Sequence, residues 1–167
     1  MVIKQKKKLI CSFYKFKELE KLNLLKKKLF EICNKNNISG TIILANEGIN
    51  GTVSGTKKSV KDLQDFIEKK IDKNVYYKIS YSEKDPFLRL KIKIKQEIVK
   101  LGVKNINVSS KTGQFIDPVN WNNFLEQEDV LLIDTRNTYE SDIGHFKNSV
   151  FPNTRSFSEF PEWIKKN

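Results

Sequence analysis

The sequence predicts an α+β domain of βαββαβ order over residues 1–95, followed by the first part of an α/β domain over 112–167. Three observations lead to this prediction. Hydrophobic periods of two and 3.6 residues alternate along the first 95 residues, which indicates strands and amphipathic helices in turn. A continuous apolar run, 130–133, then ends in Asp134, a pattern typical of a strand in a parallel sheet. The net charge also changes sign between the two parts.

The first strand is predicted over residues 8–16, which are rich in apolar residues between lysines. An amphipathic helix follows, because the next apolar residues are spaced by three and four. These residues are Leu19, Leu22, Leu25, Leu29, Ile32 and Cys33. Residues 41–45 form a short β-branched strand, 46–51 a tight polar connection, and 52–54 the returning strand. The sequence therefore predicts a hairpin after the first helix.

A second helix is predicted to begin after Thr56, whose hydroxyl suits a helix N-cap. Its apolar face would comprise Val60, Leu63, Phe66, Ile67 and Ile71. Residues 75–81 and 88–95 then alternate as strands. The whole order is that of a ferredoxin-like sheet with an additional strand and both helices on one face. Residues 96–111 are interpreted as a linker.

The positive charge is concentrated in the first part of the chain. Residues 1–111 hold 26 of the 31 Lys and Arg but 11 of the 20 Asp and Glu, whereas 112–167 hold five and nine. A basic module of this kind is expected to attract a polyanion, and nucleic acid is the first candidate. The alternative is a lysine-rich composition with no binding role.

The predicted strand 88–95 is the most basic segment. Its alternate residues Arg89, Lys91, Lys93 and Lys95 share one face, while Leu88, Leu90, Ile92 and Ile94 point to the core. Four cations in a row are expected to follow a phosphate backbone; the alternative is an edge kept soluble by lysines. Tyr76, Tyr77 and Tyr81 on the preceding strand are candidates for base stacking, but core packing is the preferred interpretation.

Several functional classes are disfavoured by composition. Two cysteines and one histidine exclude a disulfide framework and predict no metal site. No apolar run has the length of a membrane helix, and no signal sequence is evident, so a cytoplasmic protein is expected. No cofactor motif is identified, because Gly48-Ile49-Asn50-Gly51 is too short a pattern to indicate one.

One motif in the second part resembles the opening of a rhodanese-like domain. Leu132-Ile133-Asp134-Thr135-Arg136 is followed by Glu140, by Gly144-His145-Phe146 and by the strand 149–152. Strands of α/β sheets present functional residues at their carboxyl ends, and the planar fork of Arg136 is suited to hold Asp134 or Glu140. His145 is expected to bond the loop after the helix rather than act as a general base.

The resemblance implies chemistry at a cysteine thiolate held in a loop of backbone N–H groups. No cysteine lies between Asp134 and Asn167. Cys11 and Cys33 fall on a predicted strand and on the apolar face of a helix, where buried structural roles are expected. We therefore assign no catalytic residue, and we expect these 167 residues to be a fragment that lacks the nucleophile and forms no product alone.

Four motifs together resemble the bacterial oxygen-dependent tRNA uridine hydroxylase family. They are the loop containing Glu47, Gly48, Asn50 and Gly51; the basic segment 87–99; Gly113-Gln114-Phe115-Ile116 with Pro118 and Trp121; and the rhodanese motif. The resemblance implies conversion of the wobble uridine to 5-hydroxyuridine, molecular oxygen as co-substrate, and a first module that grips tRNA. It also implies members that continue beyond this length.

Two other hypotheses stay open at this stage. The first is a non-catalytic RNA-binding fragment, which predicts salt-sensitive tRNA binding without product. The second is generic rhodanese-type sulfur transfer or phosphatase chemistry, which requires a cysteine loop. Acylphosphatase activity is disfavoured because Lys15-Phe16-Lys17-Glu18 has neither a glycine-rich anion loop nor an arginine. The sequence predicts no particular oligomeric state.

Overall fold

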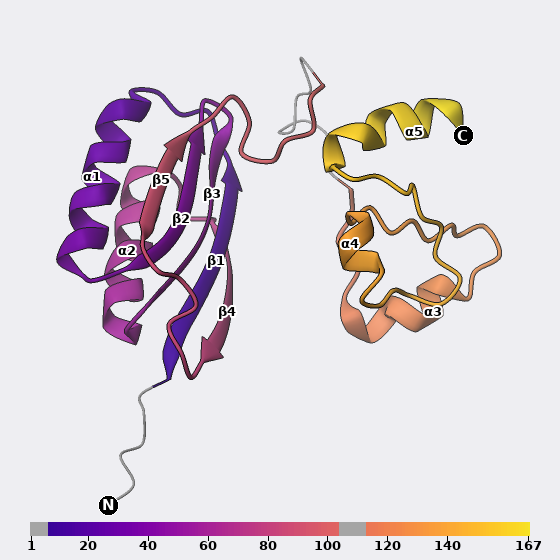
Figure 1. Cartoon of the computed structure of the whole chain (residues 1–167), viewed down its shortest axis with the longest axis horizontal. Coiled ribbons are helices and arrows are strands. Elements are labelled where there is room, and N and C mark those ends of the chain that lie inside the picture. The colour runs from indigo at the N-terminus through magenta and orange to yellow at the C-terminus, as the bar shows by residue number, and fades with distance from the viewer. Residues whose placement is uncertain (1–6, 104–112) are drawn as a thin grey trace, which may run out of the picture. The chain divides into compact units, whose positions relative to one another are not determined.

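The structure is a computed structural model that describes residues 7–103 and 113–167 (Figure 1). The chain divides into two compact units, Met1–Val99 and Lys100–Asn167. The predicted linker 96–111 therefore includes the boundary, although its residues 104–111 lie outside the described part.

The first unit contains a mixed five-stranded sheet of order β4-β1-β3-β2-β5. The strands are β1 (Lys8–Phe16), β2 (Ser39–Ala45), β3 (Gly48–Gly55), β4 (Tyr76–Ser82) and β5 (Leu90–Ile94). The pairs β1–β3, β1–β4 and β2–β3 are antiparallel, whereas β2 and β5 are parallel. The predicted ferredoxin-like order is confirmed for β1 to β4, and β5 is the additional strand at the edge beside β2.

Two helices, α1 (Leu22–Lys35) and α2 (Lys57–Lys70), cover one face of this sheet (Figure 1). The hydroxyl of Thr56 caps α2 by accepting a hydrogen bond from the Ser59 backbone N–H at 3.1 Å, as the sequence predicts. The core between sheet and helices is continuous. Its fully buried large side chains include Leu29, Ile42, Leu44, Ile49, Leu63 and Ile67.

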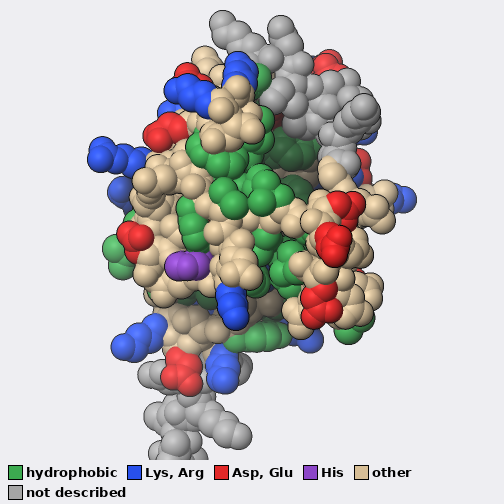
Figure 2. All heavy atoms as spheres, turned by 90° about the vertical axis from the view of Figure 1, so that its right-hand side faces the viewer, with side chains coloured by type: hydrophobic (Ala, Val, Ile, Leu, Met, Phe, Trp, Pro, Cys, Tyr) green, Lys and Arg blue, Asp and Glu red, His purple; other side chains and the backbone are tan. Residues whose placement is uncertain are grey.

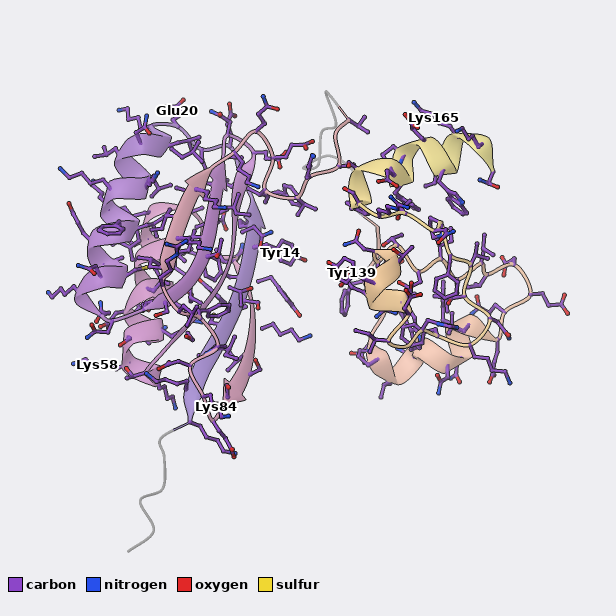
Figure 3. All side chains as sticks on the ribbon, viewed as in Figure 1. Tyr14, Glu20, Lys58, Lys84, Tyr139 and Lys165 are labelled. Carbon is purple, nitrogen blue, oxygen red and sulfur yellow. The ribbon has the colours of Figure 1, made fainter. Side chains whose placement is uncertain are left out.

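Neither helix described in the first unit lies on the opposite face of the sheet, which we call the open face. Because side chains alternate along a strand, the residues that alternate with the buried ones on each strand point away from the core. Two rows cross the open face in register. The first is Lys78, Ser12, Thr52, Thr41 and Lys91, and the second is Tyr76, Tyr14, Asn50, Ile43 and Lys93. Figure 3 shows Tyr14 on the side of the sheet away from α1 and α2.

Two details of the first unit differ from the sequence prediction. Residues 48–51 belong to β3 and are not a hairpin tip; the turn consists of Asn46 and Glu47 between the paired Ala45 and Gly48. Leu88 does not point to the core but is fully exposed. Gly40 pairs with Leu90 and β2 begins at Ser39, so no partner strand is present opposite Leu88.

The second unit consists of short elements. These are η1 (Pro118–Asn120), α3 (Trp121–Leu125), α4 (Thr138–Ser141), η2 (Phe157–Glu159) and α5 (Phe160–Lys166). The predicted strands 130–134 and 149–152 are both wrong, because in the described residues they form only an isolated parallel bridge between Ile133 and Val150. In the described residues no further strand lies beside these two, so the apolar run has one partner where a buried strand needs two.

Candidate functional site

The basic strand β5 shows the predicted alternation over its central residues. Lys91 and Lys93 stand opposite Thr41 and Ile43 and are exposed on the open face, whereas Ile92 is 8% exposed and packs in the core. The backbone N–H of Lys95 donates to the Leu44 carbonyl at 2.8 Å, which continues the pairing past the strand. The alternation therefore places these lysines as the sequence predicts, at the edge of the sheet.

Arg89 and Ile94 depart from the regular pattern. Arg89 is exposed and precedes β5, although its carbonyl accepts a hydrogen bond from the Gly40 N–H at 3.1 Å. Ile94 is 38% exposed, because β5 is an edge strand with a neighbour on one side only. The cationic row is thus Lys91, Lys93 and Lys95, with Arg89 beside its start.

The charge of the sheet is entirely positive. The five strands contain Lys8, Lys15, Lys78, Lys91 and Lys93 and no Asp or Glu. Lys8 pairs with Asp85, and Lys15 with Asp72. Within the described ranges no ion pair involves the other three lysines. Their charge therefore stays available to an external anion.

The three tyrosines of β4 have different surroundings. Tyr77 points to the helix side, where its ring lies 6.2 Å from that of Phe13 and burial raises its pKa. Tyr81 shares that side but is 63% exposed at the sheet edge. Tyr76 lies on the open face beside Tyr14. The preferred interpretation, core packing, is correct for Tyr77 and wrong for Tyr76 and Tyr81.

The sequence reasoning missed two residues of the open face, Tyr14 and Lys78. Tyr14 alternates with the buried Phe13 in β1, and Lys78 stands opposite Ser12. The period-two patterns of both strands contain this signal, since Leu9, Cys11 and Phe13 fix which side of β1 is buried. Only the pairing of β1 with β4 brings the two positions onto one surface.

The segment predicted as a loop, with Glu47, Gly48, Asn50 and Gly51, lies at the turn and start of β3 and fastens the chain that follows β5. The Glu47 carboxylate accepts a hydrogen bond from the Ile98 N–H at 2.6 Å, and the Asn50 amide donates to the Ile98 carbonyl at 3.0 Å. Ile98 is 2% exposed. These two polar side chains thus hold both backbone groups of one residue.

Gly48 and Gly51 lie so close to residues of β1 that a side chain would not fit at either position. A Cβ on Gly48, whose φ is +153°, would lie 2.1 Å from the Lys15 carbonyl oxygen. A Cβ on Gly51 would lie 2.7 Å from the Phe13 ring. Both positions require glycine because β1 lies directly beside β3. Glu47, Gly48, Asn50 and Gly51 therefore stabilise the fold of the first unit.

In the second unit, Asp134 and Arg136 form a tight charged pair. The Arg136 Nε donates to both carboxylate oxygens, at 2.9 and 3.1 Å, and Nη2 donates to Oδ2. Nη2 also donates to the Gly144 carbonyl at 2.8 Å. Hydrogen bonds from Arg136 hold the pKa of the Asp134 carboxyl below its usual range. The pair joins the end of the 130–134 segment to residue 144.

Glu140 and His145 complete this loop without joining the charged pair. The Glu140 carboxylate accepts hydrogen bonds from the Asn137 backbone and side-chain amides at the start of α4. The His145 Nδ1 lies 3.2 Å from the Ser141 carbonyl, and its ring meets Phe151 edge-on at 4.6 Å. Each side chain thus holds a turn of the loop in place.

Apolar side chains are open to solvent in the second unit, and Figure 2 shows several around the single histidine. Phe115 is 82% exposed and Ile143 89% exposed. A hollow of about 550 Å³ is lined by Gln114, Phe115, Ile116, Pro118, Trp121 and Phe146. Polar side chains are sparse in this lining, and the hollow offers no charged group for catalysis.

Neither cysteine is placed for thiolate chemistry. Cys11 and Cys33 are 1% and 0% exposed and belong to the core of the first unit. Burial raises the pKa of Cys11 to about 11 and that of Cys33 to about 12. A nucleophilic thiol needs the opposite shift, so both are structural, as the sequence predicts.

Neither a cluster of metal ligands nor a membrane-spanning helix is present in the part of the chain that the structure describes. No group of three or more His, Cys, Asp or Glu side chains lies together there in a way that suits a metal ion. Within the same residues, every helix is too short or too polar to cross a membrane.

The chain is similar to proteins named tRNA uridine(34) hydroxylase. It is 47% identical over 156 residues to the protein from Prochlorococcus marinus (strain MIT 9215), which covers 93% of this chain and 50% of the relative. The corresponding protein of Agrobacterium fabrum (strain C58 / ATCC 33970) is 41% identical over 160 residues, 95% of this chain and 51% of the relative. The chain thus spans about half the length of these relatives.

The first unit also matches a known domain family. The UPF0176 acylphosphatase-like domain matches residues 8–98, a range that starts with β1 and ends at Ile98, the residue fastened by Glu47 and Asn50. This range covers more than half of the chain. The chain therefore belongs to the family of proteins with a UPF0176 acylphosphatase-like domain.

Proposed function

We propose that this protein takes part in hydroxylation of the wobble uridine of tRNA, with molecular oxygen as co-substrate. The observation that carries the proposal is the 41–47% identity to proteins named tRNA uridine(34) hydroxylase, which extends over 93–95% of the chain. The match includes both units. The names of these relatives support uridine hydroxylation, whereas molecular oxygen as co-substrate rests on the sequence resemblance.

We assign tRNA binding to the first unit. Its sheet carries lysines and no acidic residue, and Lys91 and Lys93 face solvent without an ion pair to any described residue. Such a surface attracts phosphates independently of base sequence. The unit thus supplies affinity and orientation for tRNA.

Transfer of oxygen to the base is not assigned to a residue of this chain. Its two cysteines are buried with raised pKa values, and the Asp134–Arg136 pair is engaged in holding its loop. We assign Asp134, Arg136, Glu140 and His145 a supporting role in the second unit.

The experiment that tests the function measures 5-hydroxyuridine at position 34 in tRNA from cells with and without the gene. Nucleoside mass spectrometry should show loss of this modification on disruption and its return when the intact gene is restored. An unchanged level in the disrupted strain, together with no gain on expression in a strain that lacks the modification, would contradict the proposal.

Non-catalytic RNA binding is the second candidate, because the burial of Cys11 and Cys33 favours it for these residues. It predicts that the purified 167-residue chain binds tRNA and forms no 5-hydroxyuridine. Product formed by this chain would exclude the non-catalytic candidate. Binding without product is expected under both candidates, and loss of 5-hydroxyuridine on gene disruption then distinguishes them.

A further inference from the structure

The open face presents a pair of half-exposed tyrosines. Tyr14 and Tyr76 are direct neighbours across β1 and β4, with ring centroids 5.4 Å apart and planes inclined by 45°. They are 48% and 52% exposed. Figure 3 shows Tyr14 on the helix-free side of the sheet. Neither ring is part of the core cluster, so packing of the fold does not account for the pair.

Lysines flank this tyrosine pair at both edges of the sheet. Lys78 lies two residues from Tyr76 on β4, and Lys91 and Lys93 lie on β5. The order β4-β1-β3-β2-β5 puts four strand spacings between these edges, a width of about 19 Å. No acidic side chain belongs to the strands between them. The face thus has a cationic rim on two sides.

Uncharged polar groups occupy the middle of the open face. The Ser12 and Thr52 hydroxyls lie 3.0 Å apart in a hydrogen bond, and Thr41 follows in the same row. Hydroxyls donate and accept hydrogen bonds, as base edges and ribose hydroxyls require. The Asn50 side-chain amide already donates to the Ile98 carbonyl, so it is engaged within the fold.

These features together match the requirements of unpaired RNA. An unstacked base offers a free face to an aromatic ring, whereas bases in a duplex are already stacked on each other. Sheets of βαββαβ order that bind RNA stack two or three bases on their aromatic residues. An apolar partner would leave the lysines and the hydroxyl row without polar contacts.

We propose that the open face binds a short unpaired stretch of RNA, with bases stacked on Tyr14 and Tyr76 and phosphates at Lys78, Lys91 and Lys93. The inference rests on the proposed function and specifies its substrate contact: the face would receive unpaired nucleotides of the tRNA rather than a helical stem. It assigns the tyrosines to stacking and the lysines to the backbone.

The test uses the 167-residue chain and a single-stranded RNA oligonucleotide that contains one 2-aminopurine. The fluorescence of this base depends on what it stacks on. The double variant Tyr14→Ala/Tyr76→Ala should lower affinity at least about 10-fold and change the fluorescence of the saturated complex. The variant Tyr14→Phe/Tyr76→Phe keeps both rings and should retain the affinity and the signal.

Tyr81→Ala is the matched control, because Tyr81 lies on the same strand and is more exposed but faces the helix side. It should bind as the unsubstituted chain does. Circular dichroism checks that all variants fold. A duplex of the same sequence should bind more weakly than the single strand at equal salt.

The Lys78→Gln change tests the opposite edge of the face from β5. It should weaken binding and reduce the salt dependence by about 0.7 in log–log slope, while the fluorescence at saturation stays unchanged. A Lys78 variant that binds with unaltered slope would remove that residue from the interface and overturn the two-edged arrangement.

Unchanged affinity and fluorescence in the double alanine variant would overturn the inference. The inference would also be overturned if the double alanine variant kept its RNA affinity but changed its molecular mass in sedimentation. That result would assign the tyrosines to contact between protein copies. The proposed function has a separate readout, because loss of 5-hydroxyuridine on gene disruption does not depend on where the bases stack. Failure of one proposal is therefore distinguishable from failure of the other.

Discussion

At the residue scale, single side chains that satisfy backbone groups or charges fix the local geometry of both units. Asp134 is 8% exposed, yet it is charged because Arg136 supplies hydrogen bonds from the guanidinium and the backbone N–H. Gly48 has no side chain because β1 occupies the space.

We predict that Gly48→Ala destabilises the first unit by roughly 1–3 kcal/mol, because the added Cβ meets the Lys15 carbonyl oxygen at a strained φ. Urea unfolding followed by circular dichroism measures the change. Gly55→Ala is the control on the same strand, since its Cβ would contact no atom closer than 3.4 Å. Equal destabilisation by both changes would contradict the explanation.

The Asp134–Arg136 pair predicts a pH dependence of the second unit. The pKa of Asp134 is lowered in the folded state, so its contribution to stability is present above the unfolded value of about 4. It is lost as the pH falls from there through the lowered folded value. Asp134→Asn should remove this dependence. Trp121 and Trp163 both lie in the second unit, so tryptophan fluorescence against pH reports it; identical acid transitions in both proteins would exclude the pair as its cause.

At the element scale, the β2–β3 hairpin connects the sheet to the chain after β5. The Asn46 carbonyl accepts a hydrogen bond from Leu19 N–H, and Glu47 and Asn50 hold Ile98. The hairpin thus contacts the connection between β1 and α1 and also the last residues of the first unit. Its polar residues serve these contacts within the fold.

We predict that Glu47→Ala leaves the Ile98 N–H buried and unpaired, which costs about 1–3 kcal/mol. Amide hydrogen exchange at Ile98 should become faster by at least about fivefold. Glu47→Gln keeps an acceptor oxygen and should exchange more slowly than the alanine variant. If Ile98 exchanges at the same rate in all three proteins, Glu47 does not fasten this segment.

The elements that sequence predicts well are those whose pattern is local. The alternation of Lys91, Ile92 and Lys93 predicts which of them point to the core without reference to the strand pairing. The hydroxyl of Thr56 likewise predicts the start of α2. Leu88 was placed wrongly because its partner depends on where β2 begins. The same holds for the candidate site: Lys91 and Lys93 follow from period two, whereas the Tyr14–Tyr76 pair follows from a register between distant strands.

At the scale of the whole molecule, the two units differ in how much apolar surface they bury. The first unit has a continuous core of buried aliphatic and aromatic residues. Among residues 113–167, Pro152 is the sole apolar residue in the buried class, and the other two buried residues are the polar Asp134 and Thr154. Burial of apolar area is the main source of stability, so the units should differ in stability.

We predict that residues 113–167 open before the first unit. Native-state hydrogen exchange should show lower protection there than in β1, β2 and β3, because the described part of the second unit contains one isolated bridge in place of a sheet. Limited proteolysis should cut between 113 and 167 first. Equal protection factors in both units would contradict this prediction.

The central proposal is that the basic sheet of the first unit binds the phosphates of tRNA. The direct measurement is tRNA affinity of the 167-residue chain by fluorescence anisotropy across a salt series. The matched control is Lys26→Gln/Lys27→Gln/Lys28→Gln, which removes equal charge from exposed positions of α1 on the other side of the sheet. We expect Lys91→Gln/Lys93→Gln/Lys95→Gln to reduce the log–log salt slope by about two to three, and the α1 variant to leave it nearly unchanged. An unchanged slope in the β5 variant, or equal losses in both variants, would contradict the account.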